Sequence, residues 1–238
     1  MIKDLQKQER FVIFLDIMGF KDRVARNNHD ELELELIEFN KSITSIIKDI
    51  YSENISFENI EKEESSGSLF ALNNKKNKNN ILLAQFSDSI VLFSVDNSSD
   101  SLRKIAEAAS KIMEAAMKLD KPIPLKGALA EGRITCDMSK QLFFGQALID
   151  AYLLEENVQY YGVVVHHSAE KSVRDAGIDI FRDIEVPLKS GKIKHYELLW
   201  YKDCKNEVEK GLDNLRLSVS DSPRKYVDNT RIQMQLFK

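Results

Sequence analysis

The sequence has few cysteines and lacks any long apolar run. Its two cysteines, Cys136 and Cys204, lie far apart and show no metal-ligand spacing, so we expect a reducing, cytoplasmic location. No apolar stretch approaches the roughly 18 residues that a membrane-spanning helix needs. Residues 1–10 are charged and lack the apolar core of a signal peptide. These absences predict a soluble protein with no membrane partner.

An excess of positive charge is also missing. The chain has 34 lysines and arginines against 38 acidic residues, a formal net charge of −4, which argues against a general nucleic-acid binder. A local basic pocket for a triphosphate stays compatible with this balance. Hydrophobic residues make up 43% of the 238, enough for a packed core. The length predicts one domain over residues 1–205, with a helical extension over residues 206–238.

One acidic residue stands at the end of an apolar run near the start of the chain. Residues 11–15 read as a short buried strand, and Asp16 follows them directly. Burying this carboxylate is costly unless a cation or several donors meet it. Gly19 allows a sharp turn into a helix from about Phe20, which aims backbone N–H groups outward. This arrangement suits a metal-bound triphosphate, and the alternative is a plain strand, turn and capping acid.

A second isolated acid lies between two apolar runs at residues 81–95. The pattern predicts a tight β-hairpin with Asp88 at its tip, 72 residues after Asp16. Two carboxylates that share a site repel each other unless cations separate them. If the two strands are neighbours, the pair predicts a two-metal site.

The remaining elements follow from apolar periodicity. Helices are expected over residues 20–28, 30–52, 101–119, 145–157, 168–176, 208–215 and 224–236. Further strands are expected over residues 125–130 or beyond, 160–165, 178–185 and 195–201. Residues 53–80 and 187–194 read as loops. The order predicts an α+β sandwich on a ferredoxin-like core, whose mostly antiparallel sheet is covered by helices.

The histidines are interpreted as structural. His166 and His167 follow a predicted strand, where adjacent side chains point to opposite faces and cannot easily chelate one ion. His195 lies on a late strand and receives the same interpretation.

Four motifs in this order resemble one enzyme family. They are Asp16-Ile-Met-Gly-Phe20, Phe86-Ser-Asp-Ser89, the glycines at 127 and 132, and Phe144-Gly-Gln-Ala147 with its helix. Together they resemble the class III nucleotidyl cyclases, and within them the pyrimidine cyclases of the bacterial Pycsar anti-phage system. The resemblance runs from about Phe11 to about Trp200.

The resemblance implies that a ribose 3′-oxygen attacks the α-phosphorus of a nucleoside triphosphate and displaces pyrophosphate. Two Mg²⁺ or Mn²⁺ ions would serve this reaction, held by Asp16, Asp88 and the backbone carbonyl of Ile17. The backbone N–H groups of Met18, Gly19 and Phe20 would bind the β- and γ-phosphates.

Two further implications concern cations and assembly. The family carries a lysine on its late β-hairpin, for which Lys189 or Lys192 is favoured here over Lys194. Arg133 is a second candidate for a phosphate contact. Class III sites lie between two domains, so the resemblance implies a homodimer with its sites at the interface.

The departures from the family pattern bear on the substrate. The purine-reading positions of adenylyl cyclases hold Ala84 and Leu142 here, and the transition-state asparagine and arginine align with Ile149 and Leu153. This disfavours ATP and GTP and favours a pyrimidine nucleotide, UTP ahead of CTP. The product would be a cyclic monophosphate signal in anti-phage defence, read by a downstream effector protein.

Two other functions compete with this one. A catalytically degenerate cyclase that only binds a nucleotide or a partner would explain the missing transition-state pair, although it would not need both acids. A related enzyme that makes a cyclic dinucleotide ranks last, because Phe86-Ser-Asp-Ser89 stands where that group has its Gly-Gly-[Asp/Glu]-Glu-Phe signature.

Overall fold

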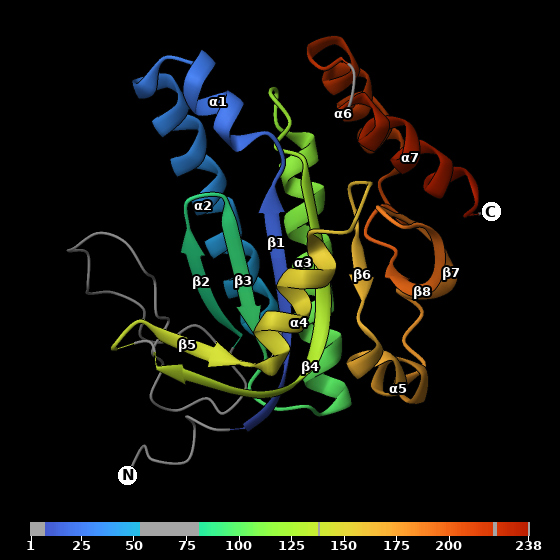
Figure 1. Cartoon of the computed structure of the whole chain (residues 1–238). Coiled ribbons are helices and arrows are strands. Elements are labelled where there is room, and N and C mark those ends of the chain that lie inside the picture. The colour runs from blue at the N-terminus through green and yellow to red at the C-terminus, as the bar shows by residue number, and fades with distance from the viewer. Residues whose placement is uncertain (1–7, 53–80, 138, 221–222, 238) are drawn as a thin grey trace.

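One mixed sheet organises the chain. The computed structural model describes residues 8–52, 81–137, 139–220 and 223–237, so the predicted loop at 53–80 and the first seven residues lie outside it. The strand order is β2-β3-β1-β4-β6-β8-β7, and β5 pairs with β4 (Figure 1). Only the pairing of β4 with β6 is parallel among the described strands. The predicted α+β fold with a mostly antiparallel sheet is confirmed.

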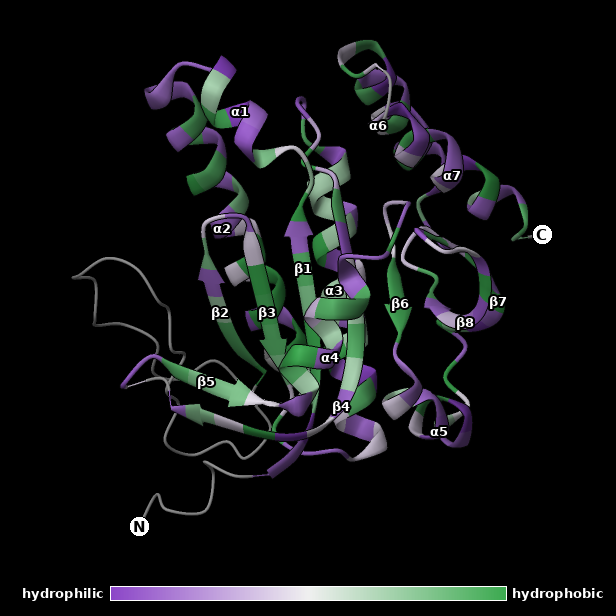
Figure 2. Cartoon of the chain, viewed as in Figure 1, coloured by the Kyte–Doolittle hydropathy of each residue, from purple (hydrophilic) through white to green (hydrophobic). Residues whose placement is uncertain are grey.

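The central strand β1 (Gln8–Ile17) separates two apolar layers, because alternate side chains of a strand point to opposite faces. Its odd-numbered residues from Phe11 to Ile17 pack in the larger core with α2 (His29–Ser52) and α3 (Ser99–Lys118). Its even-numbered residues Val12 and Phe14 pack on the other face with α4 (Gln146–Glu155). Figure 2 shows the resulting apolar colouring of β1, β3 and β6 between more polar helix surfaces.

The strands beside β1 form as expected near the site and differ from expectation elsewhere. The predicted hairpin is β2 (Leu82–Phe86) and β3 (Ser89–Phe93). β4, expected over residues 125–130 or beyond, extends from Leu125 to Asp137 and turns back into β5 (Leu142–Gly145), a strand that the sequence analysis missed. The two strands form an arm across the β2–β3 side of the sheet (Figure 1), where Phe143 stacks on Phe93 with ring centroids 5.4 Å apart. Since β5 has only four residues, no periodicity marks it.

The late strands form a closer hairpin than predicted. β7 (Phe181–Leu188) and β8 (Gly191–Leu198) leave only residues 189 and 190 between them, so the loop expected over 187–194 is mostly strand. Pro187 is compatible with this because β7 is an edge strand, where a missing N–H interrupts no further pairing.

The interpretation of His166 and His167 as strand residues is wrong. β6 is short (Val163–Val165), and His166 caps α5 (His167–Ala176) by accepting a hydrogen bond from Ser168 N. The two imidazole rings lie 4.0 Å apart instead of on opposite faces. The strand end expected at residue 165 is correct, and the two histidines that follow it begin the helix.

The predicted C-terminal helices are present and pack on their own chain. α6 (Lys205–Ser218) lies against α3, so closely that a Cβ on Gly211 would meet the Met117 side chain at 2.7 Å. α7 (Arg224–Gln235) follows, with Val227, Thr230 and Met234 buried. In the part of the chain that the structure describes, no helix is both long and apolar enough to cross a membrane.

Candidate nucleotide and metal site

The two isolated acids meet at one end of the sheet. Asp16 lies on β1 opposite Ser89 of β3, and the Ile17 N–H donates a hydrogen bond of 2.9 Å to the Asp88 carbonyl. Burial raises the pKa of the Asp16 carboxyl, and the negative charge of Asp88 raises it further. The structure therefore brings together the two acids that the sequence analysis paired, in a setting that disfavours the ionised form of Asp16.

Asp88 is presented by a strained turn. Phe86 pairs with Ser89, which leaves Ser87 and Asp88 as a two-residue connection, and Ser87 has a φ of +55°. Positive φ is uncommon for residues other than glycine, and such strain persists where the surrounding structure requires it. The hairpin thereby holds the Asp88 backbone against the end of β1.

A buried lysine lies beside Asp16 that the sequence analysis did not select. Lys126 on β4 is the direct partner of Asp16 on β1, and its charge lowers the Asp16 pKa, opposing the two causes above. Its Nζ lies 2.6 Å from Glu155 Oε1 and donates to the Glu155 carbonyl at 2.9 Å. Both residues are buried. The sequence signal for Lys126 is a charged residue inside the apolar run at 125–130, but its partner Glu155 is 29 positions away, so the sequence alone does not show the pair.

The turn predicted after β1 is present, and one of its N–H groups already has a partner. Gly19 has a φ of +74°, which glycine adopts readily, and α1 (Phe20–Arg26) begins directly after it. The Met18 N–H, however, already donates to the Pro124 carbonyl at 2.9 Å. Met18 is therefore not suited to the phosphate role, because the turn uses its N–H to join β4, and the hypothesis keeps Gly19 and Phe20.

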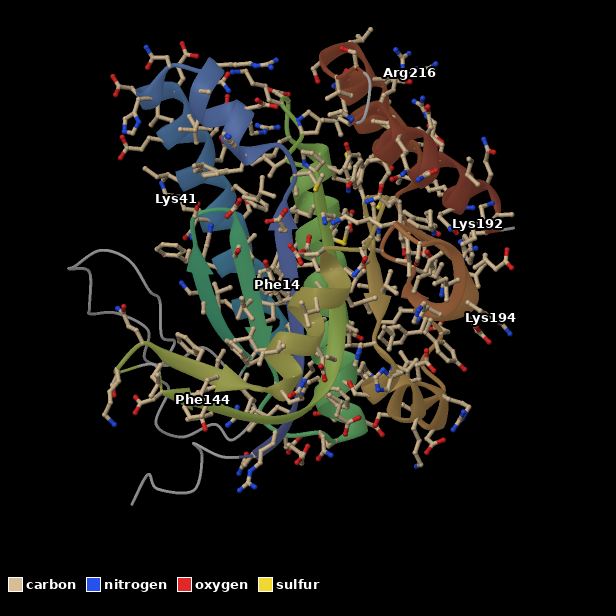
Figure 3. The ribbon with its side chains drawn as sticks, in the orientation of Figure 1. Phe14, Lys41, Phe144, Lys192, Lys194 and Arg216 are labelled. Atoms are coloured by element: carbon tan, nitrogen blue, oxygen red, sulfur yellow. The ribbon has the colours of Figure 1, made fainter. Side chains whose placement is uncertain are left out.

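The lysine candidates differ in placement. Lys189 occupies the β7–β8 turn, and its N–H donates to the Asn157 carbonyl at 2.8 Å. Its charge lowers the pKa of Tyr226 on α7, which the charge of Asp16 raises, so Tyr226 lies within electrostatic reach of both residues. Lys192 pairs with Pro187 of the edge strand and lies at the outer rim of the molecule (Figure 3), as does Lys194. Lys189 is the better placed candidate.

Arg133 lies away from this end of the sheet. It pairs with Glu9 near the start of β1, whereas Lys126 pairs with Asp16 near its end. Seven residues of extended strand separate Arg133 from Lys126, about 23 Å at 3.3 Å per residue. Within one chain, Arg133 therefore lies far from Asp16 along β4, and its contact with a phosphate stays a prediction.

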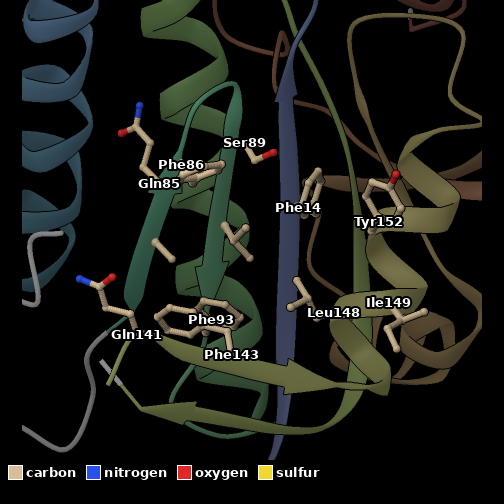
Figure 4. A pocket seen from close by; sticks show the side chains of 12 residues that line it. Phe14, Gln85, Phe86, Ser89, Phe93, Gln141, Phe143, Leu148, Ile149 and Tyr152 are labelled. Atoms are coloured by element: carbon tan, nitrogen blue, oxygen red, sulfur yellow. The ribbon is translucent and has the colours of Figure 1, made fainter. Parts of the chain in front are cut away.

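An apolar groove of about 500 Å³ adjoins the site on the α4 face of the sheet. Phe14, Phe86 and Tyr152 line it together with Phe93 and Phe143 (Figure 4). Phe14 and Tyr152 meet edge to face, with centroids 5.5 Å apart. The groove thus contrasts with the charged end of β1 beside it.

Two of the four positions that depart from the family pattern, Ala84 and Ile149, line this groove. The other two, Leu142 and Leu153, are about half exposed and are not among its lining residues. Gln85 also lines it and accepts a hydrogen bond of 2.6 Å from Asn40. The aliphatic side chains at Ala84 and Ile149 thus contribute to the apolar lining of the groove.

The donor set fits a hard divalent cation. Across the described ranges, no group of three or more His, Cys, Asp or Glu side chains is arranged to hold a metal ion. Mg²⁺ commonly binds through one or two carboxylates and completes its shell with water and substrate phosphates. Asp16 and Asp88 supply such a pair, and a bound cation would offset the burial and the Asp88 charge that raise the Asp16 pKa.

The fold is similar to solved catalytic domains of nucleotidyl cyclases. The guanylate cyclase domain of RhGC from Catenaria anguillulae, solved with GTP, has a TM-score of 0.56 and 14% identity, covering 81% of this chain and 97% of that chain. The adenylyl cyclase CyaB from P. aeruginosa has a TM-score of 0.52 and 14% identity, covering 81% and 94%. A dimeric guanylyl cyclase domain of RhoGC from Blastocladiella emersonii has a TM-score of 0.55 and 12% identity, covering 82% and 97%.

The sequence itself matches no family model and no curated protein. At these identities the structural likeness defines the fold. The chain has the fold of a class III nucleotidyl cyclase catalytic domain.

Proposed function

We propose that the chain is a pyrimidine nucleotide cyclase that converts UTP, or CTP, into its 3′,5′-cyclic monophosphate and pyrophosphate. The observation that carries this proposal is the meeting of Asp16 and Asp88 at the end of β1, within the fold of a nucleotidyl cyclase. A partly buried acid whose pKa is raised by burial and by a neighbouring acid, as the Asp16 pKa is here, is typical of functional sites.

The proposed chemistry assigns a task to each group. Asp16, Asp88 and the Ile17 carbonyl hold two Mg²⁺ or Mn²⁺ ions, which when bound lower the pKa of the attacking hydroxyl and neutralise the leaving group. The Gly19 and Phe20 N–H groups bind the β- and γ-phosphates. The new bond joins the 3′-oxygen to the α-phosphorus, the bond from the α-phosphorus to the bridging oxygen breaks, and the hydroxyl proton goes to solvent. Lys189 adds a cation for the triphosphate.

The preference for a pyrimidine rests on four positions, two of which, Ala84 and Ile149, line the apolar groove. Ala84, Leu142, Ile149 and Leu153 provide no charged or amide group at the positions where the purine cyclases carry theirs. A site built to hydrogen-bond a purine discriminates through those groups. Their replacement by aliphatic side chains supports a smaller base, and UTP is preferred to CTP on the resemblance alone.

A homodimer is part of this proposal. Large apolar side chains stand half exposed or more around the groove, and Phe86 at the hairpin is 83% exposed. Contiguous apolar surface of this kind usually marks an interaction site. A second copy of the chain would cover it and bring another set of α4 residues toward Asp16 and Asp88.

Product analysis tests the activity. The purified protein is incubated with each of the four ribonucleoside triphosphates and Mn²⁺, and the products are identified by mass spectrometry. We expect a cyclic monophosphate from UTP or CTP only, and none from the Asp88→Asn variant. Conversion of ATP or GTP would contradict the interpretation of the groove.

If the protein binds a nucleotide but forms no product, the competing function, a degenerate binding module, would be favoured.

The role in defence is tested by phage plating on cells that express the chain with its effector. Protection that survives Asp88→Asn would contradict a signalling product.

A further inference from the structure

The helix α7 lies outside the segment that resembles the cyclases, yet it makes specific polar contacts with that segment. The Tyr161 N–H donates to Thr230 Oγ1 at 2.9 Å, and Asn229 Nδ2 donates to the Gln159 carbonyl at 2.7 Å. Gln159 Nε2 in turn donates to the Tyr226 hydroxyl at 3.0 Å. Three residues within little more than one turn of α7 thus form hydrogen bonds with residues 159–161, in addition to the apolar packing of the helix.

The segment that α7 binds is the same segment that anchors the β7–β8 turn. The Gln159 N–H donates to the Pro187 carbonyl at 3.0 Å, and the Lys189 N–H donates to the Asn157 carbonyl at 2.8 Å. Val158 and Leu188 form an isolated bridge between these two bonds. Residues 157–159 therefore connect α7 to the backbone of Lys189.

A second set of contacts joins α7 to the β7 strand directly. Gln233 Nε2 donates to the Glu185 carbonyl at 2.9 Å, and Arg182 Nη2 donates to the Gln233 carbonyl at 2.7 Å. Gln233 and Thr230 are both buried. The hairpin that ends at Lys189 is thus held by α7 along its edge strand and, through residues 157–159, at its turn.

Tyr226 places the start of α7 beside the candidate site. Its ring stacks on Tyr161 with centroids 6.0 Å apart. The pKa of Tyr226 is raised by burial, lowered by the charge of Lys189, and raised by the charges of Glu155 and Asp16. The contact chain from α7 to Lys189 therefore runs along the rim of the Asp16 end of the sheet.

We propose that α7 is a positioning element of the active site, which fixes the β7–β8 turn so that Lys189 meets the triphosphate. Asn229 and Thr230 are its positioning residues, acting through the backbone of residues 157–161. This rests on the proposed function for the ligand of Lys189, while the positioning itself is a property of the protein without nucleotide.

Hydrogen exchange of the free protein tests the positioning. Asn229→Ala removes the bond to the Gln159 carbonyl, and Thr230→Val removes the acceptor of the Tyr161 N–H while keeping the side-chain shape. Asp228→Asn, an exposed change on the same helix, is the matched control. We expect the Lys189 N–H to exchange about tenfold faster in Asn229→Ala and Thr230→Val. Exchange at the wild-type rate in both variants would overturn the proposal.

A kinetic cycle tests whether the effect acts through Lys189. We expect Asn229→Ala to raise KM for the pyrimidine triphosphate about tenfold, the size of one charge-assisted contact, with kcat changed less than threefold. In a Lys189→Met background the same substitution should leave KM unchanged. Equal increases in both backgrounds would show that α7 does not act through Lys189.

The two measurements separate the two ideas. If the wild-type chain neither turns over nor binds a triphosphate, the proposed function fails, and the exchange rate of the Lys189 N–H still decides the positioning role.

Discussion

Two buried acidic regions of this molecule are built in opposite ways. Glu197 on β8 is fully buried, and its carboxylate accepts hydrogen bonds from Tyr160 and Tyr201, both 2.9 Å, and from Arg182 Nε at 2.6 Å. Asp16 is partly buried beside a second acid, and both burial and that neighbour raise its pKa. One acid is surrounded by donors, whereas the other faces a charge of its own sign.

The difference separates structural from functional use of charge. A buried carboxylate with a cation and hydroxyl donors stabilises one arrangement of β7, β8 and α7, and removing a partner exposes the full desolvation cost. A carboxylate pair without such partners lowers the stability of the free protein and is retained where a cation arrives with the ligand. The Lys126–Glu155 pair lies between these cases. Lys126 Nζ lies 2.6 Å from Glu155 Oε1, and the positive charge of Lys126 also lowers the Asp16 pKa.

The largest effect is expected at the acid pair. Asp88→Asn should reduce turnover by at least about a thousandfold, because one charge of the two-metal site is lost, while the fold is retained. Product formation by mass spectrometry and far-UV circular dichroism measure the two quantities. Asp203→Asn, an exposed acid elsewhere, is the control and should behave as wild type. Wild-type turnover in Asp88→Asn would remove Asp88 from the site.

The next effect is expected in the Glu197 network. Arg182→Met leaves Glu197 buried without its cation, and the free energy of unfolding should fall by about 3–5 kcal/mol. Urea denaturation measures this. As the control, Lys202→Met breaks the surface ion pair with Asp179, and its free energy of unfolding should equal that of the wild type. Equal stabilities for the two variants would contradict the structural role given to Glu197.

A moderate effect is expected where β1 and β4 approach each other. A Cβ on Gly127 would meet the Phe14 carbonyl oxygen and, at 2.6 Å, the Leu15 side chain, whereas a Cβ on Gly132 would find its nearest neighbour at 3.6 Å. Gly127→Ala should therefore cost about 1–3 kcal/mol and also reduce turnover, since Leu15 precedes Asp16. Gly132→Ala is the control for the same strand. A Gly127→Ala protein as stable as Gly132→Ala would show that β1 and β4 can separate at no cost.

The smallest effect is expected in the turn before Asp88. Ser87 has a φ of +55°, which glycine adopts without the steric cost that serine bears. Ser87→Gly should raise the free energy of unfolding by up to about 1 kcal/mol, while Ser87→Val should lower it. Thermal unfolding of the two variants checks the sign. A loss of stability in Ser87→Gly would mean that the serine side chain itself stabilises the turn.

The sequence predicts those parts of the site that local patterns mark. Asp16 and Asp88 are isolated acids at the ends of apolar runs, and the alternation around residues 81–95 places the second one on a hairpin tip. Gly19 marks the turn that follows β1. The strand order that makes these segments neighbours is also expected from the resemblance. Apart from the strand order, each of these features depends on residues that are close in sequence.

The parts that the sequence does not predict depend on contacts between distant residues. Lys126 meets Glu155 only because β4 and α4 pack together, and the Met18 N–H is used by Pro124 for the same kind of reason. Arg133 was selected for its charge, although its position along β4 places it at the far end of the strand. The contacts of α7 with residues 159–161 cross about 70 positions, which no local pattern reveals.

The central claim is that the Asp16–Asp88 pair is a destabilised site that a cation and a triphosphate complete. Thermal unfolding of the wild type and of Asp16→Asn, each alone and with Mn²⁺ and a non-reacting UTP analogue, tests it most directly. Because the folded-state pKa of Asp16 is raised, its ionised form at neutral pH opposes folding, and Asp16→Asn alone should unfold at the wild-type temperature or a few degrees above it. With Mn²⁺ and the analogue, the wild type should become the more stable protein and the variant should not respond. The account would be contradicted if Asp16→Asn without ligand unfolded at a lower temperature than the wild type. It would also be contradicted if Mn²⁺ and the analogue raised the unfolding temperature of the variant as much as that of the wild type.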